Sequence, residues 1–138
     1  MGDLWHENII VSANQQRPIR LYILDWEFAR PGLPGSDIGL FCAYTDILGR
    51  RNQVASSPAS AMLHSFLDAY SRVSKRDARL AQDTLAHWGI AYIFWVPRDP
   101  PGERELVQET VREGVEFLVH SRDKGFLVRS PVRGLLQK

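Results

Sequence analysis

The sequence predicts an α+β protein that is mainly α, with one β-hairpin near its start followed by about four packed helices. Two observations predict this class. Short runs rich in β-branched residues flank a turn-forming stretch before residue 25, and from about residue 36 onward apolar side chains recur at helical spacing. The chain has 138 residues, enough for one core. We therefore expect one unit over 1–138, with the hairpin in 1–35 and the helices in 36–138.

The hairpin is predicted from residues 9–13 (IIVSA) and 19–24 (IRLYIL), which are separated by the turn-forming residues 14–18 (NQQRP). Neighbouring antiparallel strands lie ~4.8 Å apart, so residues that flank the open end become neighbours. Asn8 precedes the first strand and Asp25 follows the second. The hairpin is therefore expected to bring Asn8 and Asp25 to the same place.

The first two helices are predicted from their caps and their apolar spacing. Residues 29–36 (ARPGLPGS) read as a loop, and Ser36 is a candidate N-cap for a helix over 37–50. Ser57 and Pro58 have the residue types of an N-cap and first helical position, and they predict the start of the second helix.

The later helices follow the same rules. The run from Ser74 to Asp77 fits a capping box before a long helix that ends near Trp95. Its segment HWGIAYIFWV is apolar nearly all round, so we expect a central helix with its aromatic residues in the core. A fourth helix is expected over 103–121, and the tail over 126–138 is expected to pack only in part. The aromatic residues assigned to the core are Trp88, Tyr92, Phe94 and Trp95.

Composition excludes several classes of function. The net charge is +1, which gives no attraction to nucleic acid or to an acidic membrane surface. No apolar stretch reaches the ~18 residues needed to cross a bilayer, and the first residues do not resemble a signal peptide. The single cysteine, Cys42, lies in an apolar run and is expected in the core. The expectation is a cytoplasmic protein with neither nucleic-acid nor membrane partners.

The polar residues at the front form a coherent chemical set. Asp3, on a loop, could accept a proton from a substrate hydroxyl. The amide oxygen of Asn8 and the carboxylate of Asp25 are hard oxygen ligands suited to Mg²⁺, which keeps several waters and takes few protein ligands. A base beside a magnesium site is the arrangement used for phosphoryl transfer, where catalysis consists mostly of positioning and charge neutralisation.

The segments GDLWHEN (2–8) and ILDWE (23–27) resemble the catalytic loop and the metal-binding segment of the aminoglycoside phosphotransferase and choline kinase-like superfamily. The resemblance is dense over 2–40 and includes GSDIG at 35–39. It implies a kinase-like C-terminal lobe in which Asp3 is the catalytic base and Asn8 and Asp25 bind Mg²⁺. The substrate would be a small molecule with a hydroxyl group, phosphorylated by ATP.

The resemblance also assigns supporting roles. Asp37 would brace the catalytic loop from the start of a helix, and Glu27 would be a second acidic contact. Other residues near the site are candidates for substrate contact or auxiliary roles: Trp5, His6, Glu7 and Trp26.

The sequence departs from the family pattern in two ways. Met1 stands at the family's histidine position, and the sequence has no glycine-rich loop, strand lysine or paired helix glutamate of a nucleotide-binding lobe. We therefore expect a C-terminal lobe without its N-terminal lobe, with weak or absent ATP binding by itself. Mg²⁺ and ATP would be cofactors if kinase activity is retained, and otherwise none is expected. The hairpin face would then be exposed, and a homodimer or another partner would cover it.

Two other hypotheses remain open from the sequence. The lobe could serve as a non-kinase acid/base enzyme, of the isomerase, cyclase or lyase type, because clustered carboxylates raise one pKa among them. It could also be a non-catalytic, pseudokinase-like module that dimerises through the exposed lobe face.

Overall fold

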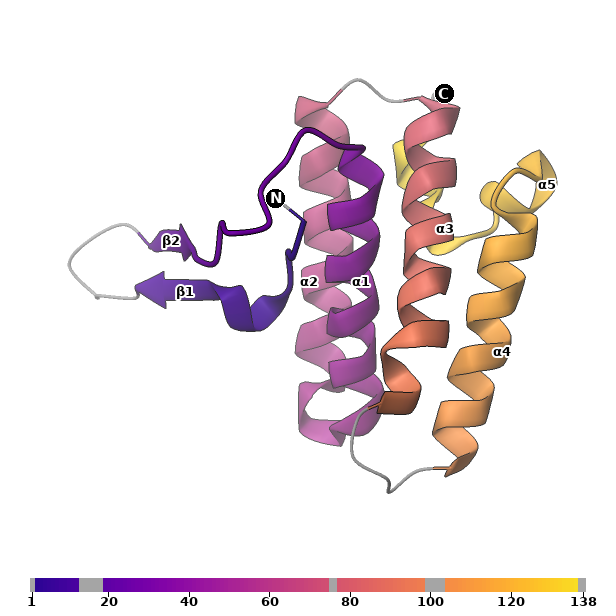
Figure 1. The fold of residues 1–138 in the computed structure, drawn as a ribbon, viewed down its shortest axis with the longest axis horizontal. Coiled ribbons are helices and arrows are strands. Elements are labelled where there is room, and N and C mark those ends of the chain that lie inside the picture. Colours follow the sequence, from indigo (N-terminus) through magenta and orange to yellow (C-terminus); the bar gives the residue numbers. More distant parts are fainter. Residues whose placement is uncertain (1, 13–18, 75–76, 99–103, 137–138) are drawn as a thin grey trace.

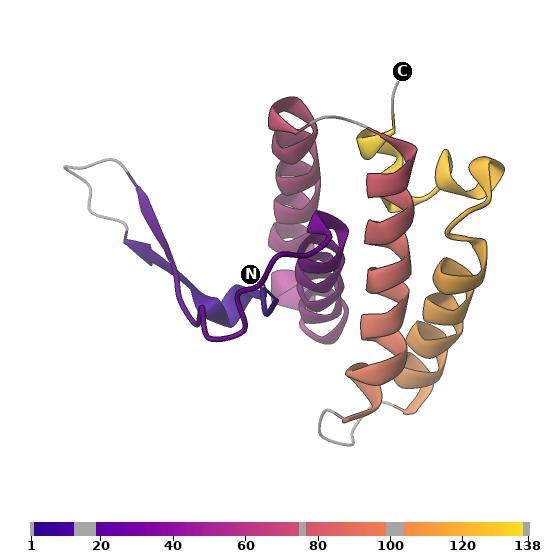
Figure 2. The ribbon, with the colours of Figure 1, turned by 45° about the horizontal axis from the view of Figure 1, so that its top comes forward.

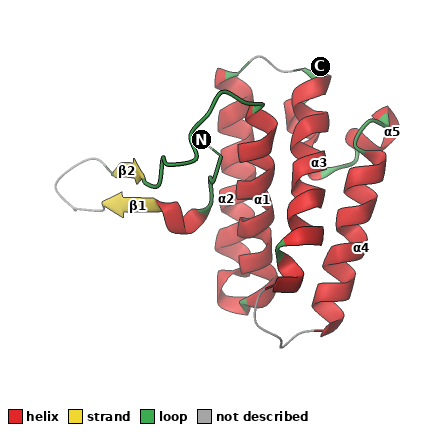
Figure 3. Ribbon diagram, in the orientation of Figure 1, coloured by secondary structure: helices red, strands yellow, loops and turns green. Residues whose placement is uncertain are grey.

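A computed structural model describes residues 2–12, 19–74, 77–98 and 104–136. It confirms the predicted class, since long helices make up most of the molecule and the strands form one small antiparallel sheet (Figure 3). No helix within these ranges is both long enough and apolar enough to cross a membrane.

The predicted hairpin is present and stands out from the helices (Figures 1 and 2). Strand β1 (Ile9–Ser12) pairs with β2 (Arg20–Ile23), with Ile9 opposite Ile23 and Val11 opposite Leu21. The predicted turn at 14–18 lies outside the described residues. Nearly all strand residues are exposed, because none of the other described elements packs closely on this two-stranded sheet.

Helix α1 (Pro34–Arg51) begins earlier than predicted. Leu33 is at the N-cap position, and Pro34 at the first helical position has a φ already suited to a helix and lacks an N–H that would need a partner. The prediction that Ser36 caps this helix is wrong. The Ser36 hydroxyl instead donates to the carbonyl of Leu33 at 2.8 Å, from inside the first turn.

Helix α2 (Gln53–Val73) also begins earlier than predicted. The side chain of Asn52 accepts from the backbone N–H groups of Val54 and Ala55, at 3.0 and 3.3 Å. These bonds satisfy two N-terminal donors and start the helix ahead of Pro58, which lies inside it. The predicted start at Ser57 and Pro58 is therefore wrong.

Helix α3 (Ala78–Phe94) begins later than a capping box from Ser74 would place it, and its cap is simpler. The Asp77 carboxylate accepts from the Leu80 N–H at 2.7 Å. Ser74 takes no part in a capping box, because it ends α2 and its hydroxyl donates to the Tyr70 carbonyl. As predicted, α3 is the central helix: it packs between α1 on one side and α4 (Arg104–His120) on the other (Figure 1).

The aromatic residues of α3 divide between core and surface. Trp88 and Tyr92 lie in the core, as predicted, at 3% and 0% exposure. The prediction is wrong for Phe94 and Trp95, which are 45% and 43% exposed. They lie at the last turn, where the chain leaves the packed helices for the short 3₁₀ turn Val96–Arg98.

The C-terminal part contributes some residues to the core and leaves others exposed. A short helix, α5 (Lys124–Leu127), and a 3₁₀ turn (Pro131–Leu135) follow α4. Leu127, Val132 and Leu135 are fully buried. Their apolar side chains join the helix core, whereas other residues of the tail are exposed, so the described part of the tail packs only in part, as expected. The exposed residues are Val128, Arg129, Pro131, Arg133 and Gly134.

Candidate active site

The loop that carries Asp3 is fixed to the start of α1. The backbone N–H of Gly2 donates to Oδ1 of Asp37 at 2.7 Å, and Asp37 lies in the first turn of α1, where the helix dipole favours a carboxylate. Gly2 has a φ of +106°, and a Cβ there would come within 2.7 Å of the Phe28 carbonyl oxygen. Only glycine fits this approach without displacing the backbone.

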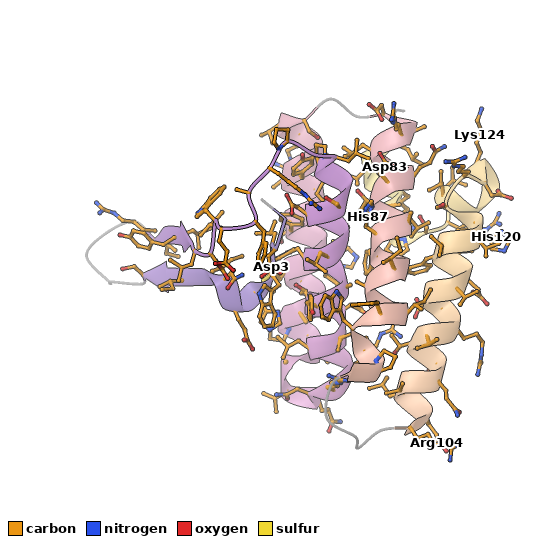
Figure 4. The ribbon with its side chains drawn as sticks, viewed as in Figure 1. Asp3, Asp83, His87, Arg104, His120 and Lys124 are labelled. Atoms are coloured by element: carbon orange, nitrogen blue, oxygen red, sulfur yellow. The ribbon has the colours of Figure 1, made fainter. Side chains whose placement is uncertain are left out.

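Within this loop, Asp3 and Asn8 are in direct contact. The Asn8 side-chain amide donates to the Asp3 carboxylate at 3.2 Å and to the Asp3 carbonyl at 3.1 Å. The 3₁₀ turn His6–Asn8 closes the loop, with the Asn8 N–H donating to the Trp5 carbonyl. Because Nδ2 of Asn8 is directed at Asp3, its Oδ1 is the atom left for a cation. Figure 4 labels Asp3 where the loop passes between the hairpin and α1.

The hairpin brings the segment of Asp25 beside Asn8. The N–H of Leu24 donates to the Asn8 carbonyl at 2.8 Å, and Asp25 is the next residue. Asp25 has a φ of 57°, the one positive φ among the described non-glycine residues. This conformation costs an L-residue about 1–2 kcal/mol, and such strain gathers at functional sites. The Trp26 indole N–H donates to the Ile23 carbonyl at 2.7 Å, which holds the turn after the strand.

Two of the candidate contact residues face inward. The ring of Trp5 lies 5.0 Å from that of Tyr44 on α1, and the His6 ring lies 5.5 Å from Trp5. Nδ1 of His6 is buried and has no hydrogen-bond partner within the described part of the chain. These half-buried rings support the loop from the side of α1. Tyr44 was missed from the sequence, although its spacing from Leu40 places both on one face of the helix.

The remaining candidates face solvent. Glu7 and Glu27 are exposed, and the Trp26 side chain is 56% exposed. Contact of these three residues with substrate stays a prediction. Their exposure leaves them accessible from the side of the hairpin.

The donor set around Asn8 fits magnesium better than a transition metal. No cluster of three or more His, Cys, Asp or Glu side chains able to hold a metal occurs in the described ranges. Mg²⁺ is commonly held by one or two carboxylates while it keeps several waters. An amide oxygen of Asn8 and the carboxylate of Asp25, on segments joined by a backbone hydrogen bond, therefore suit Mg²⁺.

A cavity of about 280 Å³, which we name the loop-side cavity, opens beside the Asp3 loop. It is formed by Gly2, the loop after the hairpin, the start of α1 and one face of α3. Its walls mix apolar and polar side chains. The lining includes the side chains of Arg30, Asp37, Leu40, His87, Ile90 and Trp95.

A larger cavity of about 770 Å³, the far-side cavity, is lined by α1, α2 and the C-terminal turns. A polar network that the sequence did not reveal lies at its edge. The buried Tyr92 hydroxyl donates to Asp46, and Arg50 bonds both Asp46 and Glu113, the latter at 2.7 Å. Burial raises the pKa of Tyr92, and the negative charge of Asp46 adds to this effect. The thiol of Cys42 likewise has a raised pKa because it is buried.

Comparison with known proteins identifies relatives of this chain. Residues 2–106 match the model of the phosphotransferase enzyme family. The chain is similar to 4-hydroxytryptamine kinase from Psilocybe cubensis, at 30% identity over 83% of this chain and 32% of that protein. It is also similar to 4-hydroxytryptamine kinase from Psilocybe cyanescens, at 29% identity over 84% of this chain and 32% of that protein. The chain thus spans about a third of the length of these relatives. No solved structure matches it significantly.

Proposed function

We propose, since the chain belongs to the phosphotransferase enzyme family, that it forms the C-terminal lobe of a small-molecule kinase over residues 1–138. The observation that carries the proposal is the contact set of the front loop. Asn8 bonds Asp3 through its side chain and Leu24, the neighbour of Asp25, through its backbone. Base and metal-ligand candidates thus lie on adjoining segments.

In this proposal Asp3 is the catalytic base. Its carboxylate is half-buried and held by the Asn8 amide, which fixes its orientation, and it would take the proton of the attacking hydroxyl. Asp37 is a positioning residue, because it holds Gly2 and so the loop that carries Asp3.

Asn8 and Asp25 would hold Mg²⁺ through Oδ1 and a carboxylate oxygen, with Glu27 as a second acidic contact. When bound, ATP would supply the phosphoryl group and Mg²⁺ would neutralise its negative charge. The left-handed backbone at Asp25 supports a role beyond folding, because strained backbone of this kind gathers at functional sites.

The hairpin supports a further part of the proposal, namely that another protein surface covers it. An isolated two-stranded hairpin is marginally stable in water, and apolar residues on both of its faces are exposed here. A second copy of the chain or a separate protein would bury these residues. Light scattering at increasing concentration tests the first possibility, and a clean monomer refutes it. The exposed apolar residues of the hairpin are Ile10, Val11, Leu21, Tyr22 and Ile23.

The names of the relatives suggest the class of acceptor. Both are called 4-hydroxytryptamine kinases, and this chain covers about a third of each. We therefore propose a hydroxylated aromatic amine as the acceptor for this chain and 4-hydroxytryptamine as the first compound to test.

The experiment measures phosphate transfer from Mg-ATP to 4-hydroxytryptamine, with the chain alone and with a separately supplied nucleotide-binding lobe from one of these relatives. General-base catalysis contributes about 10²–10⁴-fold, so Asp3→Asn should lower turnover by that factor. Asp83→Asn is the control, because Asp83 is an acidic residue on α3 whose carboxylate pairs only loosely with Arg79, at 3.9 Å.

The proposal fails if no Mg-dependent transfer occurs with the added lobe, or if Asp3→Asn turns over as fast as the parent. Asp3-dependent turnover without nucleotide would instead support the acid/base enzyme. Self-association with neither activity would support the pseudokinase-like module, which the exposed hairpin favours.

A further inference from the structure

We propose that the far-side cavity binds a small molecule with an anionic head and an apolar body. This site goes beyond the kinase function, because no described residue of its lining belongs to the Asp3 loop or to the hairpin. The cavity also lies against a different face of α1. Tyr44 contacts the loop, whereas Asp46 lines the cavity, and at about 100° per residue the two side chains point about 200° apart around the helix.

The segment from Ser121 to Leu136, which supplies part of the lining, is strongly basic. It holds four basic side chains and one acidic side chain, although the whole chain has a net charge of only +1. All four are exposed, and none forms an ion pair within the described part of the chain. Figure 4 labels one of them, Lys124, on the side of the molecule away from the hairpin. The four are Arg122, Lys124, Arg129 and Arg133.

Two of these basic residues, Arg129 and Arg133, line the cavity. The pKa of Asp123 is lowered mainly by the hydrogen bond from the Phe126 N–H, and Arg129 adds to this effect, so Asp123 offsets part of the Arg129 charge. The proposal therefore depends mainly on Arg133. An arginine presents five N–H donors in a planar group that matches the oxygens of a carboxylate or a phosphate.

The acidic side chains of the lining already have partners. Arg50 bonds both Asp46 and Glu113, and Asp68 pairs with Arg72 one turn later in α2. These pairs reduce the repulsion that an anion would meet. Because Arg50 carries one positive charge for two carboxylates, the anionic head is expected at the end formed by the C-terminal turns and not beside Glu113.

The remaining wall suits the body of such a ligand. Leu63, Leu67 and Trp88 line the cavity and belong to the apolar core. Ser56 and Ser60, four residues apart on α2, also line it, and their hydroxyls can donate to an anionic head. At about 770 Å³ the cavity lies within the range of ligand pockets, so it can hold an apolar chain as well as its head.

The test is calorimetric titration of the whole chain with decanoate, a carboxylate on an unbranched apolar chain, without nucleotide or Mg²⁺. Octanoate should bind about tenfold more weakly than decanoate, because it buries two fewer CH₂ groups. Decylammonium, a cation with a chain of the same length, should bind at least about tenfold more weakly than decanoate, because it cannot accept from a guanidinium.

Arg133→Gln removes the charged donor and should weaken decanoate binding about tenfold. Arg122→Gln is the matched control: it removes the same charge from the same basic segment, but Arg122 is outside the cavity lining, so binding should change by less than about twofold. Ser60→Glu places a carboxylate in the lining and should also weaken binding. Ala61→Glu is its control, because it adds the same charge at an exposed position of α2 outside the lining.

The proposal is overturned if the parent chain does not bind decanoate, if Arg122→Gln weakens binding as much as Arg133→Gln, or if decylammonium binds as tightly. Binding to phosphatidylglycerol vesicles without binding of free decanoate also refutes it, because the basic segment would then contact a membrane surface instead of the cavity holding a ligand. Asp3→Asn should leave decanoate binding unchanged. Failure of the kinase function therefore leaves this proposal standing, and the reverse also holds.

Discussion

Replacing Asp37 by Ala tests how the catalytic loop is held. The substitution removes the acceptor of the Gly2 N–H, a 2.7 Å bond between a backbone donor and a carboxylate. Hydrogen bonds to charged groups contribute about 1.5–3 kcal/mol, and water screens this partly exposed one, so we take ~1.5 kcal/mol. That free energy corresponds to about tenfold in the equilibrium between anchored and released loop. Asp37→Asn keeps an acceptor without the charge and should cost about half as much.

The assay is amide hydrogen exchange followed by NMR. In Asp37→Ala, the amides of residues 2–8 should lose about tenfold in protection, while those of α3 keep theirs. Loss of the favourable interaction with the helix dipole should lower global stability in urea by at least ~0.5 kcal/mol, because Asp37 lies in the first turn of α1. Local release is therefore separable from global unfolding.

Asp83→Ala provides the control, since it removes an acidic residue from the first half of α3 whose carboxylate pairs with Arg79 at 3.9 Å. The reasoning is refuted if loop protection is unchanged in Asp37→Ala, or if protection falls equally in α3. Equal loss in the Ala and Asn variants would show that the charge contributes nothing.

Three further predictions concern stability. Burial raises the pKa of the Cys42 thiol and the Tyr92 hydroxyl, so the folded state keeps both protonated after the unfolded chain begins to lose these protons, near pH 8.5 and 10. The contribution of each group to the free energy of unfolding should therefore be fully present below its unfolded-state pKa. It should fall by up to ~1.4 kcal/mol per pH unit, above about pH 8.5 for Cys42 and above about pH 10 for Tyr92. In urea titrations, Cys42→Ala and Tyr92→Phe should each remove one proton's share of the slope in its own pH range. Unaltered slopes would contradict this. Gly89→Ala should destabilise by about 1–3 kcal/mol, because its Cβ would lie 2.5 Å from the Gly114 carbonyl oxygen where α3 meets α4. Gly134→Ala, with nothing within 4 Å, is the neutral control in thermal melts, and equal effects would disprove the close contact. Asp25→Gly should be about 1 kcal/mol more stable than Asp25→Ala in urea, because glycine adopts a φ of 57° without strain while both variants lack the carboxylate. Equal stabilities would show that Asp25 is not strained.

The hairpin, the helical character of the remainder and the motif residues of the front loop were all predictable from the sequence. These depend on local patterns: β-branched and aromatic residues in IIVS and RLYI, helical spacing after residue 36, and the order of Asp3, Asn8 and Asp25. Antiparallel pairing of adjacent strands is a short-range event, so it follows from the chain between them. Family membership followed from the same short segments.

Several residues near each helix start could begin the helix, and residue type alone does not predict which of them does. Ser36 and Ser57 are good caps by residue type. However, α1 begins with Pro34 at its first helical position, and the side chain of Asn52 caps α2. The contact between Asp37 and Gly2 joins residues 35 positions apart. The resemblance assigned Asp37 the role of bracing the loop, but only the folded structure shows its hydrogen bond with the Gly2 N–H.

Tertiary structure alone decided which apolar residues are buried and where a cavity opens. Trp95 and Leu135 are both apolar, yet Trp95 lies at the end of α3 beside the loop-side cavity and Leu135 is buried in the core. Tyr44 reaches Trp5 because α1 runs beneath the loop. Burial depends on which surfaces the helices present to one another after packing, and residues distant in sequence determine this. A hydrophobic pattern of period 3.6 identifies the apolar face of each helix, but it does not identify the helix that packs against that face.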